Sequence, residues 1–184
     1  MTSKWLERWS EKYRNRKLIP YLEQVIEMRK LHAQAWSDSE IKQRAKTMKR
    51  RTQEGAASDR DVIEVAALVD EAVWRVKGFR LYEVQWLAGM ALHEGCIIEM
   101  QTGEGKTLAA VLPAFLQALS GRGVHVLTFN DYLANRDAEW TRPIYEYLGV
   151  TVGCITERCS AKDRQRAYAA DITFLQQNRQ VMIT

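Results

Sequence analysis

Residues 100–107 read MQTGEGKT and follow a short apolar run at 96–100. The end of this octapeptide matches the phosphate-binding pattern G-x-x-x-x-G-K-[ST], whereas Met100 stands where the strict pattern has glycine. An order of strand, glycine-rich loop and helix predicts a mononucleotide-binding unit. We expect Pro113 to kink the helix that follows the loop.

The residue types in this loop suit a polyphosphate. Gly103 and Gly105 allow a tight turn in which successive N–H groups point inward, and the helix that follows adds its positive end. We expect Lys106 to reach the β- and γ-phosphate oxygens and Thr107 to complete the shell of a bridging Mg²⁺. The alternative, a turn that merely joins strand to helix, is disfavoured because all parts of the pattern occur in order.

Two residues upstream of the loop are candidates for binding the base. The amide of Gln85 offers both a donor and an acceptor, which suits the N6 and N7 edge of adenine. Taken alone, such a glutamine is more often an exposed helix residue. Tyr82 is a candidate for stacking on the same base, and a core position is equally plausible.

Outward from the loop, helical stretches alternate with short β-branched runs. Helices are predicted over 58–78 and 82–93, and buried parallel strands over 124–129 and 151–155. The alternation predicts an α/β fold of the P-loop NTPase (RecA/helicase-like) type, a partial parallel sheet flanked by helices with the ligand at its carboxyl edge. We assign residues 58–184 to this nucleotide-binding domain. The unfinished sheet leaves a strand edge exposed, which predicts self-association.

Residues 1–57 are predicted to form an all-helical, basic N-terminal extension. Three aromatic residues recur on one side of a helix over 5–17, and further helices are expected after Pro20 and from a capping box at 37–40. Residues 1–60 carry 15 Lys+Arg against 8 Asp+Glu, a net charge of +7. This charge favours an anionic partner such as a membrane surface or nucleic acid, or else marks a solvated helix face.

Composition excludes several classes of protein. No apolar stretch approaches the roughly 20 residues of a membrane span, and the charged N-terminus lacks the apolar core of a secretory signal, so we expect a cytoplasmic location. Three cysteines give neither a disulfide framework nor zinc spacing. The sequence therefore favours a protein with reduced thiols and no metal centre of its own.

Hydrolysis of ATP requires an acidic pair downstream of the phosphate loop, one carboxylate on Mg²⁺ and one orienting water. No adjacent Asp-Glu pair follows Lys106, and Asp70-Glu71 precedes the loop within a helical pattern. We therefore identify no catalytic residue and expect nucleotide binding without efficient hydrolysis.

Six segments together resemble the SecA preprotein translocase ATPase family, at 82–85, 92–95, 99–107, 130–139, 149–153 and 168–173. The most specific is 130–139, NDYLANRDAE, whose charged residues we expect to cap and pair within the next helix. The resemblance runs from about residue 18 to about residue 173 and indicates the N-terminal part of the first nucleotide-binding, DEAD-like motor domain. Beyond 173 the pattern is lost, and we expect the Walker B pair and the second motor domain to lie beyond this chain.

The resemblance implies ATP or ADP with Mg²⁺ as the ligand. Carried over by position, it implies that Gln85 reads adenine, that Tyr82 lies near the base and that 101–107 wrap the phosphates. SecA proteins usually have Arg or Lys where this chain has Gln101, so we expect weaker affinity. The nucleotide-binding residues assigned in this way are Tyr82, Gln85, Gln101, Thr102, Gly103, Glu104, Gly105, Lys106 and Thr107, of which Thr107 also reaches the metal.

The resemblance also implies partners and leaves two alternatives. The implied partners are the protein translocation channel and preproteins, with ATP coupled to export at the inner face of the cell membrane. A non-catalytic module that binds the motor or the membrane is one alternative. A fragment of a superfamily 2 nucleic-acid helicase is the other, and segment 130–139 argues against it.

Overall fold

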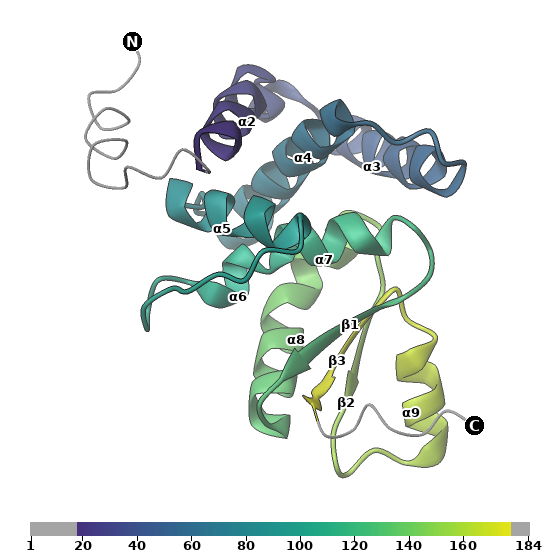
Figure 1. Cartoon of the computed structure of the whole chain (residues 1–184). Helices are drawn as coiled ribbons and strands as arrows, with labels where there is room; N and C mark the ends of the chain where they lie inside the picture. The colour runs from purple at the N-terminus through teal and green to yellow at the C-terminus, as the bar shows by residue number, and fades with distance from the viewer. Residues whose placement is uncertain (1–17, 178–184) are drawn as a thin grey trace.

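The computed structural model of the chain describes residues 18–177. Its elements are α2 (Ile19–Lys30), η2 (Ala33–Ala35), α3 (Asp38–Gln53), α4 (Asp59–Lys77), α5 (Glu83–His93), α6 (Lys106–Ala109), α7 (Val111–Ala118), β1 (Val124–Thr128), α8 (Asp131–Tyr147), β2 (Val152–Ile155), α9 (Ala161–Tyr168) and β3 (Ile172–Gln176) (Figure 1). None of the described helices is long and apolar enough to cross a bilayer. The basic helix predicted over 5–17 lies outside the described residues.

Helices occupy one end of the molecule and the sheet occupies the other. Figure 1 shows α2, α3 and α4 at the top, the sheet with α8 and α9 at the bottom, and α5, α6 and α7 between them. The main hydrophobic core runs from Val25 on α2 and Ile41 on α3 to Ile144 on α8 and Phe174 on β3. The helices of the predicted extension therefore pack on the same core as the sheet.

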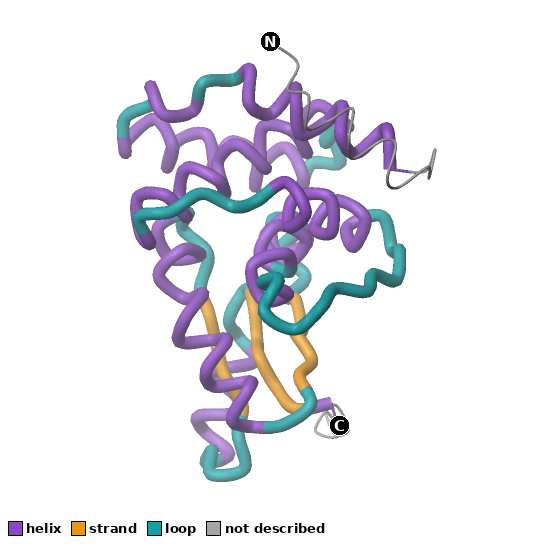
Figure 2. Tube along the Cα trace, turned by 90° about the vertical axis from the view of Figure 1, so that its left-hand side faces the viewer, coloured by secondary structure: helices purple, strands orange, loops and turns teal. Residues whose placement is uncertain are grey.

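Three parallel strands form the sheet in the order β1-β3-β2, and Ile172 of β3 stands opposite the first residue of each neighbour. Helix α8 covers one face and α9 the other (Figures 1 and 2). Side chains alternate along β3, because Phe174 joins the main core whereas Leu175 packs with Ala167 of α9. The predicted α/β fold, a parallel sheet flanked by helices, is confirmed.

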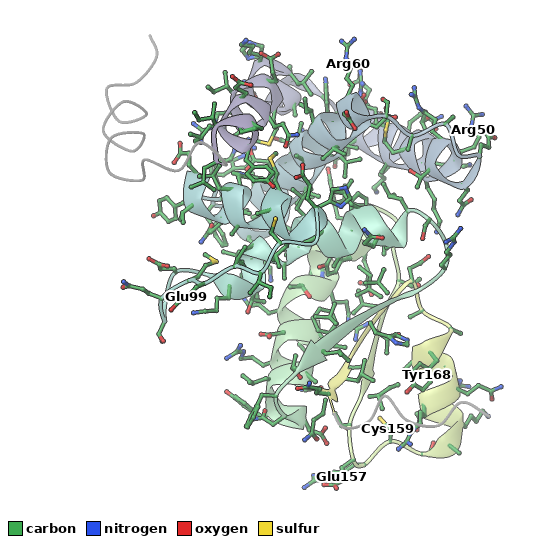
Figure 3. All side chains as sticks on the ribbon, in the orientation of Figure 1. Arg50, Arg60, Glu99, Glu157, Cys159 and Tyr168 are labelled. Atoms are coloured by element: carbon green, nitrogen blue, oxygen red, sulfur yellow. The ribbon has the colours of Figure 1, made fainter. Side chains whose placement is uncertain are left out.

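The prediction of a strand over 96–100 is wrong. Within the described residues this segment is irregular and belongs to no sheet. Ile97 is fully exposed, and Figure 3 shows Glu99 on an arm that projects from the body. A β-branched run becomes a strand only when a neighbouring strand takes up its N–H and C=O groups. The apolar pattern is local, whereas that pairing is not.

Strand β1 is only partly buried, so the prediction of buried strands is wrong for it. His125 and Leu127 are exposed along an alternating pattern, whereas β2 begins and ends with buried residues. The reason is position, because β1 is an edge strand and α9 packs chiefly on β2 and β3. An edge strand covered on one face alternates between buried and exposed side chains.

The helices predicted within residues 18–177 are confirmed, and local capping explains where several of them begin and end. At the start of α3 the Glu40 N–H donates to Ser37 Oγ at 3.3 Å, and the Ser37 N–H donates to Glu40 Oε2 at 2.7 Å. Gly78 ends α4 in the left-handed conformation, with φ of 78°. Asn130 caps α8 by accepting the Leu133 N–H at 2.9 Å, the kind of role predicted for its segment.

Pro113 interrupts the helix after the phosphate loop, as predicted. Helix α6 ends at Ala109 and α7 begins at Val111. Pro113 has no N–H to donate to the Ala109 carbonyl four residues earlier. That carbonyl faces Gly89 of α5, where an added Cβ would lie 2.8 Å from it. The break therefore occurs where α5 packs closely against this segment.

Gly153 on β2 is expected to tolerate no side chain, because a Cβ there would lie 2.4 Å from the Ala167 carbonyl oxygen of α9. We expect Gly153→Ala to lower the free energy of unfolding by about 1–3 kcal/mol, since α9 must move away from the sheet. Urea unfolding measures the change, with Ala169→Ser at the exposed end of α9 as the control. An unfolding midpoint equal to that of the parent chain would contradict the prediction.

Candidate functional site

The predicted phosphate loop lies on the arm that joins α5 to α6. Residues 101–104 and Lys106 are exposed, and Gly105 and Thr107 are partly buried. A loop with so little buried surface is held mainly by its hydrogen bonds. These hydrogen bonds define the site.

The loop satisfies several of its own polar groups. Lys106 Nζ donates to the Gln101 carbonyl at 2.7 Å, and the Gln101 N–H donates to Glu104 Oε2 at 2.7 Å. The Glu104 N–H donates back to the Gln101 carbonyl at 3.3 Å. Gly103, with φ of 90°, lies within the turn that these bonds close. The Lys106 ammonium group is therefore bonded to a carbonyl of the loop, and the Glu104 carboxylate accepts one of the N–H groups of the loop.

Gln85 is buried, and its amide ties α5 to the loop. The residue is only 5% exposed. The amide nitrogen donates to the Glu104 carbonyl at 3.0 Å, and the amide oxygen accepts the Tyr82 N–H at 3.0 Å. Both halves of the amide predicted to read adenine are thus engaged within the protein. Recognition of adenine by Gln85 stays a prediction, and in this arrangement it requires the amide to exchange partners.

Gly105 leaves the space that the Gln85 amide occupies. Its φ is 86°, and an added Cβ would lie 2.3 Å from the amide nitrogen of Gln85. Both the left-handed backbone and the close approach therefore require glycine. From the sequence, Gly105 was predicted to form the tight turn and to bind the nucleotide, and its packing against Gln85 was not predicted.

Thr107 contacts a carboxylate from another helix. Its hydroxyl donates to Asp137 Oδ1 of α8 at 3.2 Å, and Arg136 donates to the same oxygen at 2.7 Å. A hydroxyl that donates keeps its lone pairs for a metal ion, and a carboxylate is an oxygen ligand of the kind that Mg²⁺ prefers. The residues present therefore fit the metal predicted at Thr107.

Asp137 is the residue of the site that sequence reasoning missed. It was expected only to cap or pair within its helix, and it does pair with Arg136. Thirty positions separate it from Thr107, too many for any helical or strand spacing to connect them. Its place within the specific segment 130–139 was the one signal available.

Tyr82 stands at the N-cap of α5 and is 72% exposed. A core position for its ring is therefore excluded, and the ring is open to a planar ligand. The base-stacking prediction for Tyr82 remains compatible with the geometry. Its backbone N–H, by contrast, is committed to Gln85.

The excluded acidic pair, Asp70 and Glu71, belongs to an ion-pair network on α4. Arg80 pairs with Asp70 at 2.6 Å and with Glu71 at 2.7 Å, and Arg75 pairs with Glu71 at 2.8 Å. Burial raises the pKa of Asp70 even though Arg80 opposes the shift. These carboxylates are thus engaged in ion pairs with the end of α4 and with the segment that follows it.

Comparison with known proteins finds close relatives. A family model described as the SecA DEAD-like domain matches residues 3–182. The protein translocase subunit SecA of Myxococcus xanthus is 51% identical over 144 residues, which are 78% of this chain and 15% of that protein. SecA of Thermosynechococcus vestitus is 47% identical over 161 residues, which are 86% of this chain and 17% of that protein. SecA 1 of Nitrosospira multiformis is 49% identical over 164 residues, which are 88% of this chain and 18% of that protein. The chain spans less than a fifth of the length of these relatives.

Gly103 and Gly105 form a matched pair for testing the Gln85 contact, because both have positive φ but only Gly105 has atoms within 4 Å of an added Cβ. We expect Gly103→Ala to lower the free energy of unfolding by about 1 kcal/mol through backbone strain. Gly105→Ala should lower it by about 1 kcal/mol more, since Gln85 loses its bond to Glu104. Urea unfolding of both variants measures the difference.

Removing the amide provides the control for this pair. In a chain that already carries Gln85→Ala, the amide that would clash is gone. Adding Gly105→Ala to that chain should therefore lower the free energy of unfolding by no more than Gly103→Ala lowers it in the parent chain. Equal losses for the two glycine variants in the parent chain would refute the steric role of Gln85.

Proposed function

The chain belongs to the SecA DEAD-like domain family, and on this premise we propose that it supplies the ATP-binding portion of a SecA-type protein translocase motor. The observation that carries the proposal is the phosphate loop, in which Lys106 and Thr107 follow two glycines of positive φ. Inward-facing N–H groups with a lysine and a hydroxyl at the end of the turn suit a polyphosphate. Gln85 supports this reading because it anchors the loop to α5.

Nucleotide binding in this proposal exchanges internal partners for phosphate oxygens. Lys106 leaves the Gln101 carbonyl for the β- and γ-phosphates, and a phosphate oxygen takes the place of the Glu104 carboxylate on the Gln101 N–H. Bound Mg²⁺ would supply positive charge that neutralises the phosphates. Thr107 and Asp137 are the residues that would hold it. Tyr82 stacks on the base, and Gln85 reads its edge.

We propose that the chain binds ATP or ADP with Mg²⁺ without efficient hydrolysis. No adjacent Asp-Glu pair follows Lys106 in the sequence, so no residue is assigned to orient an attacking water. Gln101 stands where a basic residue is usual in the family, which favours modest affinity.

The wider setting follows from the relatives, whose name is protein translocase subunit. We propose a cytoplasmic protein that meets the inner face of the membrane and shares the translocation channel and preproteins as partners. Anionic lipid is a further partner proposed for the basic N-terminal segment, which lies outside the described residues. Identity of about half to SecA proteins argues against a nucleic-acid helicase.

Lys106→Ala is expected to abolish measurable binding of Mg-ADP and Mg-ATP, because the charge on the phosphates loses its partner. Isothermal titration measures binding, and phosphate release is followed in the same samples. Lys162→Ala, on the exposed side of α9, is the control and should bind as the parent chain does. Failure of the parent chain to bind either nucleotide would refute the proposed function.

Thr107 gives a test of the metal site. We expect Mg²⁺ to strengthen ADP binding to the parent chain and to Thr107→Ser, which keeps the hydroxyl, by the same factor. Thr107→Val keeps the shape but has no hydroxyl, so this strengthening should be lost. Titration with ADP, with Mg²⁺ and with chelator, compares the three proteins. An equal Mg²⁺ effect in Thr107→Val would show that Thr107 does not reach the metal.

A further inference from the structure

Helix α2 contacts both ends of α5, the helix that carries Gln85. At the start of α5, Arg29 pairs with Glu83 at 2.6 Å. At its end, the Tyr21 hydroxyl donates to Glu94 Oε2 at 2.7 Å. The two helices therefore run alongside each other in opposite directions. The contacts lie eight residues apart on α2, and eleven residues separate Glu83 from Glu94, the C-cap residue of α5.

The contact at Tyr21 is largely buried. Tyr21 is 8% exposed and joins the main core, and its hydroxyl also lies 3.8 Å from Cys96 Sγ. The hydrogen bond to Glu94 raises the pKa of Tyr21, because ionisation would place two negative charges together. Since Glu94 and Cys96 begin the arm, this contact fixes the end of the arm that is farther from the phosphate loop.

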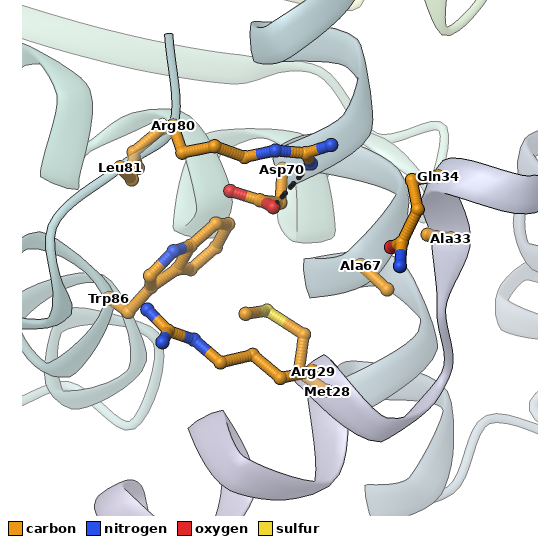
Figure 4. A pocket seen from close by; sticks show the side chains of 9 residues that line it. All are labelled: Met28, Arg29, Ala33, Gln34, Ala67, Asp70, Arg80, Leu81 and Trp86. Atoms are coloured by element: carbon orange, nitrogen blue, oxygen red, sulfur yellow. Dashed lines mark hydrogen bonds and ion pairs between the residues drawn. The ribbon is translucent and has the colours of Figure 1, made fainter. Parts of the chain in front are cut away.

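The contact at Arg29 lies beside the Gln85 network. Glu83 is the first residue of α5, and Gln85, two positions later, holds both the Tyr82 N–H and the Glu104 carbonyl. Between the two contacts, Val25 and Met28 of α2 join the same buried core as Trp86 and Met90 of α5. A pocket whose walls include Arg29 and Trp86 opens beside the Arg29 contact (Figure 4). The two polar contacts therefore fix the ends of a seam that is apolar in its middle.

We propose that α2 is a positioning element for the phosphate loop, with Arg29 and Tyr21 holding the two ends of α5 so that Gln85 stays on the Glu104 carbonyl. Neither residue touches the loop itself. The consequence for nucleotide affinity rests on the proposed function above, whereas the consequence for the order of the loop does not.

The first experiment measures hydrogen exchange in the nucleotide-free chain. The amides of Tyr82, Gln101 and Glu104 each donate a bond within the network and report on its order. We expect their exchange to quicken about threefold in Arg29→Ala and about tenfold when Tyr21→Phe is added, while amides of α9 are unchanged. Lys30→Ala is the matched control, because Lys30 pairs with Glu27 within α2.

The second experiment tests the pairing directly. Arg29→Glu should loosen the loop, and adding Glu83→Arg should restore both its exchange rates and the Kd for Mg-ADP, which a loss of packing alone would not allow. The proposal is overturned if Arg29→Ala and Lys30→Ala give the same exchange at these amides, or if the reversed pair restores nothing. Absent ADP binding by the parent chain would count against the proposed function, and the exchange data would still decide the role of α2.

Discussion

The side-chain amide of Gln85 is the interaction on which the site depends. One planar group accepts a hydrogen bond from the start of its own helix and donates one to a carbonyl of the phosphate loop. Residues 101–104 of the loop are exposed, so burial contributes little to holding them. Gly105 is part of the same arrangement, because its missing side chain is what admits the amide.

Helix α5 carries this interaction because it is fixed on several sides. Trp86 and Met90 join the main core. Gly89 allows the Ala109 carbonyl, which Pro113 leaves without its usual helical donor, to approach closely. The helix thus stands between the helical end of the molecule and the loop. A well-packed helix that carries an exposed loop is a common way to place binding groups.

Features that depend on neighbouring residues could be predicted from the sequence, whereas features that depend on distant residues could not. Ser37, Gly78 and Pro113 act within one or two helical turns, so the boundaries they set were predictable. The prediction of a strand at 96–100 failed because a strand depends on a distant partner. The exposure of β1 was not predicted because it depends on the place of that strand at the edge of the sheet. The contacts of Thr107 with Asp137 and of Gln85 with Glu104 are likewise created by the fold. Motif spacing found the loop but not what supports it.

The bonds that close the loop have a consequence for how fast a ligand is exchanged. The Glu104 carboxylate occupies a loop N–H, and Lys106 is satisfied by a carbonyl of the same turn. An incoming anion therefore competes with an intramolecular anion that is always at high local concentration. Each hydrogen bond that the incoming anion makes replaces an internal bond of the loop, and the internal bond re-forms when the anion departs. Such a loop favours short residence times for any anion that binds to it.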